Sequence, residues 1–512
     1  MSADAPGGRG GPTQHRVQAS VILRARSGKS AREPDAPITP QNVASYMPAE
    51  DAPREAADAL RRLGFDVDHV GLTHVTISGD KALFERVFGA RLAAKSHPVF
   101  GGQRAAAHHV HFASDRPLSV PESLSRLVDA VELAKPAAFF ADPTPPNVPY
   151  PHIGVPDDVA RGMDAAAAHE MGVTGRGVTL AMVDSGFMTP FHPYYEGRGY
   201  DIKPVVPDPS DPSPGDDSGG HGTGVAACAL AVAPGVSLTI YKANPASVNS
   251  VSLTDAFSRA AAARPDIISC SWGTQDHFEN PLLWPDLRVL VNHAVAAGIV
   301  VLFATGNAEG PVSWPASEPA VISVGGAFWT GDGRVMASSF CRSGTNYINK
   351  SRECPDVCGL SGMAPRGVYV AVPTQPESAI DRLYAGGIFP GGDETLTNDG
   401  WVVASGTSVA TPMVAGVCAL MLQHDPALRR KPARVRDALE RSCLDVVCGS
   451  SASGLPGGLG RDNATGFGLA QAHKAIRALD ARKSESAKVA RPERRKEARR
   501  RSRASQRRLS PA

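Results

Sequence analysis

The stretch 178–186, VTLAMVDSG, joins a mainly apolar run of strand length to a carboxylate and a turn. Similar short apolar runs recur along the chain, at residues 237–242, 267–270, 299–304 and 320–324. The segments between them have the pattern of helices, at residues 223–233, 251–264 and 285–298. Apolar strands that alternate with helices predict an α/β fold, in which a mostly parallel sheet is sandwiched by helices.

A smaller unit precedes this domain. Alternating apolar residues at 17–23 predict a strand, and two amphipathic segments that end at Gly64 and Gly89 predict helices, so we expect a small α+β unit. Residues 136–156 contain seven prolines, which predicts an extended linker. The predicted division is a disordered start (1–15), the α+β unit (16–135), the linker (136–156), the α/β domain (157–480) and a basic tail (481–512).

Charge and hydropathy exclude several classes of protein. The net charge is +2, but residues 482–512 hold 13 Lys and Arg against 3 Glu, so the rest of the chain is acidic. A basic tail on an acidic body is therefore favoured over a uniformly basic nucleic-acid binder. The tail is expected to be a solvated arm, with weak binding to nucleic acid or an anionic membrane, or a targeting signal, as the alternatives. No apolar run reaches the roughly 20 residues of a membrane span, and the N-terminus lacks an apolar signal segment. We expect a cytoplasmic location in preference to non-classical secretion.

Three groups of residues are candidates for metal or disulfide sites. The eight cysteines are expected to be mostly reduced, with local bridges at Cys354–Cys358 and Cys443–Cys448 as the alternative. His108, His109 and His111 have no carboxylate or thiolate nearby in ligand spacing, so no metal site is predicted there. The acidic loop at 208–217 could hold calcium, but its Pro, Ser and Gly content favours a solvated loop. No cofactor is predicted, and calcium stays possible without an assignable site.

Four short motifs carry the chemistry: DSG at 184–186, GHGTGVA at 220–226, ATGN at 304–307 and GTSVATP at 406–412. A serine such as Ser408 needs a base to become a nucleophile, and His221 can be that base. Asp184 can hold the imidazole in the right tautomer. The side-chain amide of Asn307 and the backbone N–H of Ser408, at a helix start, can stabilise a developing oxyanion.

The order Asp184, His221, Asn307, Ser408 resembles that of the subtilisin-like serine peptidases, over roughly residues 150–475. The resemblance implies a serine endopeptidase acting on polypeptides. It also implies a substrate-pairing strand formed by Ser271, Trp272 and Gly273. A pocket for the residue before the scissile bond is implied at Ala304, Thr305 and Gly306. Trp272 stands where the family usually has Leu, which leaves side-chain preference open.

The N-terminal unit has its own resemblance. Residues 63–90 resemble the prodomains of subtilase-like and kumamolisin-like peptidases. This implies a self-processing zymogen with its processing site in the linker at 136–156, whose N-terminal region acts as an intramolecular inhibitor or folding aid. A catalytically silent subtilase fold that serves as a binding module is the alternative, and the complete set of four catalytic groups argues against it. A basic-tailed scaffold associated with nucleic acid is a third hypothesis.

Overall fold

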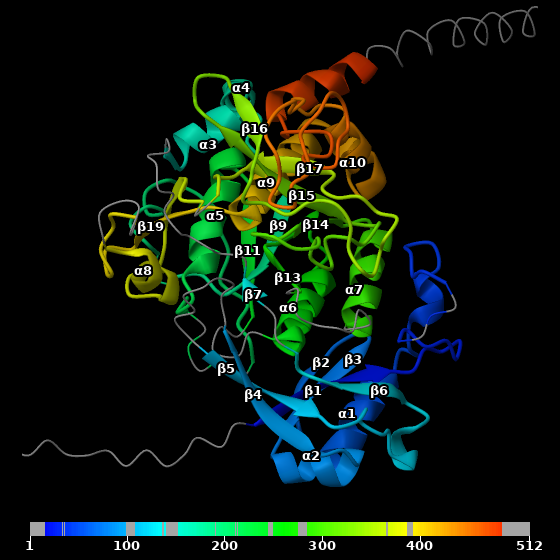
Figure 1. The fold of residues 1–512 in the computed structure, drawn as a ribbon. Coiled ribbons are helices and arrows are strands. Elements are labelled where there is room, and N and C mark those ends of the chain that lie inside the picture. The colour runs from blue at the N-terminus through cyan, green and yellow to red at the C-terminus, as the bar shows by residue number, and fades with distance from the viewer. Residues whose placement is uncertain are drawn as a thin grey trace, which may run out of the picture.

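The computed structural model describes residues 16–32, 34, 36–98, 108–135, 138–139, 152–189, 191–209, 211, 213, 215–243, 249–274, 284–364, 367–386 and 393–483. Figure 1 shows a small N-terminal unit, in blue, beneath a larger domain that runs from cyan to red. The predicted start at 1–15, most of the linker and almost all of the basic tail lie outside the described residues.

The larger domain is built on one central sheet. Its strand order is β10(Asp201–Ile202), β11(Ser237–Lys242), β9(Thr179–Asp184), β12(Ile267–Cys270), β14(Val300–Ala304), β15(Ile322–Trp329) and β16(Val335–Ala337), and β17(Val357–Leu360) also pairs with β15. Every pair is parallel except β15 with β16. The chain leaves β9 for β11 on one side and then crosses to β12 on the other. Open α/β sheets bind ligands at such a reversal, outside the carboxyl ends of the strands.

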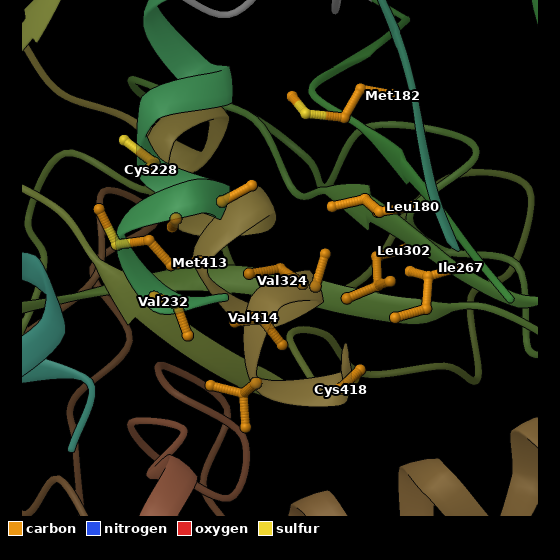
Figure 2. Close-up of a cluster of buried hydrophobic side chains, with 14 of the residues drawn as sticks. Leu180, Met182, Cys228, Val232, Ile267, Leu302, Val324, Met413, Val414 and Cys418 are labelled. Carbon is orange, nitrogen blue, oxygen red and sulfur yellow. The ribbon is translucent and has the colours of Figure 1, made fainter. Parts of the chain in front are cut away.

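Helices cover both faces of this sheet. Because parallel crossovers are right-handed, the reversal places α5(His221–Val232) on one face and α6(Ser250–Ala262) and α7(Pro285–Ala296) on the other. α9(Thr407–His424) packs beside α5, and a β-carbon on Gly416 would come within 2.7 Å of Val232, so glycine allows this close approach. Figure 2 shows side chains of α5 and α9 against Leu180, Ile267, Leu302 and Val324 of four neighbouring strands.

Shorter elements complete the domain. They are β8(Ile153–Gly154), α3(Asp157–Gly162), α4(Ala165–Glu170), β13(Trp272–Gly273), β18(Val370–Pro373), α8(Ala379–Tyr384), β19(Trp401–Ala404), η4(Pro426–Leu428) and α10(Pro432–Glu440). Residues 472–483 form a further helix. Among the described residues, no helix combines the length and the apolar character that crossing a membrane requires.

The N-terminal unit is an antiparallel sheet with helices on one face. The sheet has the order β2(Asp66–Val70), β3(His74–Gly79), β1(Val17–Leu23) and β6(Val128–Leu133). Apolar side chains of β1 and β3 pack with α1(Ala52–Arg62) and α2(Lys81–Phe88) in a separate core. A hairpin of β4(Leu92–Pro98) and β5(His108–Ser114), and the short helices η1(Val43–Tyr46) and η2(Glu122–Leu124), complete the unit. β7(Ala138–Phe139) follows it.

The second face of this sheet is polar and docks on α6 and α7, as Figure 1 shows. Ser20 Oγ donates to Asp286 Oδ2 on α7 at 2.6 Å, and Thr76 Oγ1 donates to Asp255 Oδ1 on α6 at 2.7 Å. The backbone of Lys135 exchanges two hydrogen bonds with Ser250, each 2.8 Å long. The start of α6 is thereby capped by the N-terminal unit.

The predicted fold class is confirmed, with a parallel sheet between helices. The predicted helix at 285–298 agrees with α7 to within two residues, because Pro285 opens it and Gly298 follows its end. The predicted boundaries at 135, 156 and 480 stay predictions.

Candidate active site

The centre of the site is a hydrogen-bonded pair at the end of β9. Asp184 is the last residue of β9, where the strand order reverses, and His221 is the first residue of α5. His221 Nδ1 lies 2.7 Å from Asp184 Oδ1, and both side chains are buried. The same oxygen accepts from the N–H of Ser185 at 2.8 Å. An Nδ1–H donor to a carboxylate leaves Nε2 as the basic nitrogen of the ring.

A second carboxylate, Asp217, holds the loop that carries His221. It is fully buried and accepts four hydrogen bonds. Its Oδ1 accepts from Ser185 Oγ at 2.7 Å and from the N–H of Gly220 at 3.0 Å. Its Oδ2 accepts from the N–H and the Oγ1 of Thr223, at 2.7 and 2.6 Å. Burial raises the pKa of Asp217, and the hydrogen bonds from Thr223 and Ser185 oppose this rise. Asp217 thus fixes the first turn of α5 through hydrogen bonds.

Ser408 lies in the first turn of α9, after a glycine in the left-handed region. Gly406 has φ of +122°, which favours glycine, and the helix begins at Thr407. Pro412 removes the N–H that would normally bond the carbonyl of Ser408. That carbonyl instead accepts from Ser271 Oγ at 2.9 Å, while Ser408 Oγ donates to the carbonyl of Ser271 at 3.2 Å. Ser271 follows β12, which neighbours β9, so Ser408 is held next to the strand that ends at Asp184.

Asn307 follows β14 and faces the turn before Ser408. Its Oδ1 accepts from the N–H of Thr407 at 2.9 Å and from Thr407 Oγ1 at 3.1 Å. A β-carbon on Gly406 would come within 2.5 Å of Asn307 Nδ2, so glycine makes room for the donor end of the amide. The amide oxygen of Asn307 therefore fixes the turn before Ser408, and the amide N–H donors of Asn307 lie beside that same turn.

The three predicted strand residues lie together, but the side chain of Trp272 does not face a subsite. It is fully buried, its Nε1 donates to the carbonyl of Val183 at 2.9 Å, and its ring packs on Phe303 with centroids 5.1 Å apart. Only the backbone of Trp272 and Gly273 is placed for strand pairing. It pairs antiparallel with β7, in the register Trp272 with Phe139 and Gly273 with Ala138.

The three predicted pocket residues form the end of β14 and the turn before Asn307. Ala304 and Thr305 are fully buried, and Gly306 has φ of +103°. The N–H of Gly306 donates to Thr407 Oγ1 at 3.1 Å, which ties this turn to the nucleophile turn. A β-carbon on Gly306 would come within 3.0 Å of the Arg342 stem, so a side chain at 306 would fill this space.

Part of the acidic loop is buried, which differs from the sequence expectation of a solvated loop: Asp208 and Asp217 are buried, whereas Ser213 is exposed. The side chain of Lys242, at the end of β11, is fully buried and forms an ion pair with Asp211. Its Nζ also donates to the carbonyls of Ser213, at 2.8 Å, and Asp216. Oxygens of Asp211, Ser213 and Asp216 thus surround an ammonium group. The conformation of this loop is held by Lys242, which ends a run of mainly apolar residues in the sequence.

The cysteines are free thiols in the structure, and seven of the eight are buried. Burial raises the pKa of Cys341 to about 11 and of Cys418 to about 12, so these groups are not nucleophiles. Sequence reasoning missed Asp217, Ser185 and Lys242. The one local signal was the position of Asp217, a carboxylate four residues before His221 and close enough to cap its helix.

Comparison with known proteins places this geometry in a family. The Subtilase family profile matches residues 175–468, which is more than half of the chain and includes all four motifs. The chain belongs to the subtilase family. Serine protease AprX of Bacillus subtilis (strain 168) is 30% identical over 297 residues, which are 52% of this chain and 61% of AprX. M-protease of Shouchella clausii (strain KSM-K16) is 29% identical over 362 residues, which are 68% of this chain and 77% of M-protease.

A solved structure supports the fold of this subtilase. Fervidolysin from Fervidobacterium pennivorans, a keratinolytic enzyme related to subtilisin, matches 91% of this chain and 61% of its own with a TM-score of 0.52. The sequence identity is 18%, so this likeness concerns the fold alone. The subtilase described here spans less than two thirds of the length of AprX and of fervidolysin.

Proposed function

We propose that this subtilase is a serine endopeptidase that hydrolyses peptide bonds through an acyl-enzyme. One observation carries the proposal: four separate elements bring an Asp–His pair, a serine at a helix start and an amide to the same edge of the sheet. The pair is Asp184 and His221, at 2.7 Å, and the other two groups are Ser408 and Asn307. Membership of the subtilase family supports it.

Each group has one role in the proposed reaction. Ser408 Oγ attacks the carbonyl carbon as His221 Nε2 takes its proton, and His221 then gives that proton to the leaving amine. Asp184 fixes the tautomer of His221 and stabilises the imidazolium. Asn307 Nδ2 and the N–H of Ser408 donate to the oxyanion. Water then releases the acyl group by the same steps, and no cofactor takes part.

A fluorophosphonate probe tests this proposal and separates it from the silent binding module. We expect labelling of Ser408 in the mature protein, and no labelling of Ser408→Ala or His221→Ala. Ser351→Ala is the matched control, since Ser351 is exposed and remote from the motifs in sequence. A mature wild type that is folded but neither labelled nor able to cleave casein would favour the binding module.

We also propose that the protein is a zymogen whose N-terminal region occupies the substrate strand. The ladder between β7 and β13 supports this, because it is the added-strand mode of peptide binding. The two strands are antiparallel, so β7 runs from Gly273 toward Ser271, and Ser271 contacts Ser408 Oγ at 3.2 Å. A strand in this register brings the peptide bonds that follow Phe139 to the nucleophile. Tethering raises the effective concentration of this segment.

The position of self-cleavage tests the zymogen proposal. We expect the mature chain to begin between residues 140 and 142, as determined by N-terminal sequencing and intact mass. Ser408→Ala should remain one chain. A mature N-terminus beyond residue 145 would contradict the register, and an active wild type that stays full-length would identify the N-terminal unit as a permanent accessory domain.

A further inference from the structure

Two histidines and an aspartate form a cluster where the N-terminal unit meets the peptidase domain. His69 on β2 and His74 on β3 belong to the N-terminal unit, and Asp255 belongs to α6. One nitrogen or oxygen atom of each side chain lies within 4.8 Å of those of the other two. Figure 1 shows β2 and β3 directly below α6. In the part of the chain that the structure describes, this is the one such group of three with ligand atoms so close.

The cluster is buried and its hydrogen bonding is incomplete. His74 is fully buried, Asp255 is 4% exposed, and His74 Nε2 lies 2.6 Å from Asp255 Oδ1. His69 Nε2 and His74 Nδ1 are also buried, yet neither has a hydrogen-bond partner among the described residues. A buried polar atom without a partner costs about 1–3 kcal/mol and calls for an explanation. A metal ion bound between the two units would give His69 Nε2 a partner.

The charges around the cluster favour a cation. Besides Asp255, the carboxylate of Asp208 acts electrostatically on His69, and that of Asp286 acts on His74. Arg259 is the arginine that acts on His69. Arg259 donates to the backbone carbonyls of Pro207, Lys242 and, at 3.3 Å, Asp255, so these hydrogen bonds of its guanidinium go to carbonyl oxygens and not to the carboxylate of Asp255. The surroundings therefore carry more negative than positive charge.

We propose that His69, His74 and Asp255 bind a zinc ion that clamps the N-terminal unit to the peptidase domain. Two imidazoles and one carboxylate are a ligand set that suits zinc, with water in the fourth position, whereas calcium and magnesium prefer oxygen alone. Ligands about 2.0–2.1 Å from a tetrahedral zinc lie roughly 3.3 Å apart. His74 Nε2 and Asp255 Oδ1 would thus separate by less than 1 Å from their present 2.6 Å, with the remaining proton of His74 on Nδ1.

The proposed site exists only while the two units are docked, because each unit supplies part of it. Zinc therefore stabilises the docked state by mass action, and docking strengthens zinc binding by the same factor. This clamp is independent of the peptidase chemistry. In the cleaved protein, it would slow release of the N-terminal unit from the substrate strand.

The full-length Ser408→Ala chain, which cannot process itself, is the protein to test. After dialysis against a chelator, calorimetric titration with ZnCl2 should show one bound equivalent and a rise in melting temperature. His69→Gln and Asp255→Asn, each in the Ser408→Ala background, should lose that equivalent. His69→Gln removes a ring nitrogen that has no partner, so it should fold. His424→Gln is the matched control, since His424 also faces a carboxylate, Asp480 at 2.7 Å, and should bind zinc as the parent does.

Cobalt(II) in place of zinc distinguishes this site from the cysteines, of which Cys448 is exposed. The site should give visible bands of tetrahedral cobalt without a thiolate-to-cobalt transition. Failure of the parent to bind either metal would overturn the proposal, as would undiminished binding by folded His69→Gln and Asp255→Asn. A thiolate transition that accounts for the bound cobalt would also overturn it. His74 and Asp255 would then be an ordinary buried hydrogen-bonded contact.

Discussion

Replacement of Asp217 tests how the base of the catalytic pair is positioned. Asp217→Ala removes the acceptor of four hydrogen bonds, and three of its donors belong to the loop and first turn that carry His221. A net contribution of about 1 kcal/mol for each bond, with the cost of unsatisfied buried donors, predicts a loss of about 3–5 kcal/mol of unfolding free energy. Asp217→Asn keeps the bonds at Oδ1 and places an amide donor against the N–H of Thr223. It should lose about 2–3 kcal/mol.

Denaturant unfolding of the variants in the Ser408→Ala background measures these losses without self-cleavage. Asp201→Asn is the matched control. Asp201 is exposed and paired with Lys203, and a surface pair of this kind contributes at most about 1 kcal/mol. In the active protein, a displaced His221 should lower kcat by up to about 100-fold with a smaller change in KM. If Asp217→Ala cost no more than Asp201→Asn, or left kcat unchanged, Asp217 would not position His221.

Three further predictions concern the rest of the site. Asn307→Ala should lower kcat by about 10²–10³-fold, the loss known for the oxyanion asparagine of subtilisin. Asn307→Asp keeps the oxygen that accepts from Thr407 but should lower kcat at least as much. Higher activity of the Asp variant than of the Ala variant would indicate a structural role for Asn307. Lys242→Met leaves Asp211 buried without its cation and should cost about 3–5 kcal/mol in denaturant unfolding, part of which Asp211→Asn should restore; an unchanged midpoint would contradict the ion pair. Activity and melting temperature should not respond to dithiothreitol, whereas a large fall in melting temperature would reveal a disulfide.

Local patterns in the sequence were sufficient for most of the sheet and for the catalytic motifs. Strand runs such as 178–183 are apolar on both faces, which only a covered parallel sheet explains. The predicted helix 251–264 agrees with α6 at Ser250–Ala262, because Asn249 caps it with hydrogen bonds to the N–H groups of Val251 and Ser252. The order of the four motifs is that of the subtilisin-like serine peptidases, whereas the chemistry of a nucleophile and its base is compatible with other orders.

The features that escaped prediction depend on partners far apart in the chain. Lys242 ends an apolar run, and nothing near it in sequence indicates that its ammonium meets the loop at 211–216. Trp272 in place of the family's usual Leu left side-chain preference open. In the structure, its ring nitrogen donates to the carbonyl of Val183 and its ring packs on Phe303, so the side chain lies in the core. His74 and Asp255 are 181 residues apart, so only the docking of the two units brings them together.

In the proposed zymogen, the chemistry of the docking face would allow the N-terminal unit to leave the substrate strand after cleavage. Each unit has its own apolar core, and the face of the N-terminal sheet that meets α6 and α7 is mainly polar, with hydrogen bonds such as those of Ser20 and Thr76. Among the described residues, the apolar cluster shared by both units is small, and consists of Ala31, Ile38, Val43 and Tyr46 around Val289 of α7. Polar groups that lose each other on separation regain hydrogen bonds to water, whereas a large apolar face would stay exposed. In the proposed zymogen, separation after cleavage would therefore cost little in hydration. The affinity between the units depends on a few specific contacts, among which those of Asp255 with His74 and Thr76 are the most deeply buried.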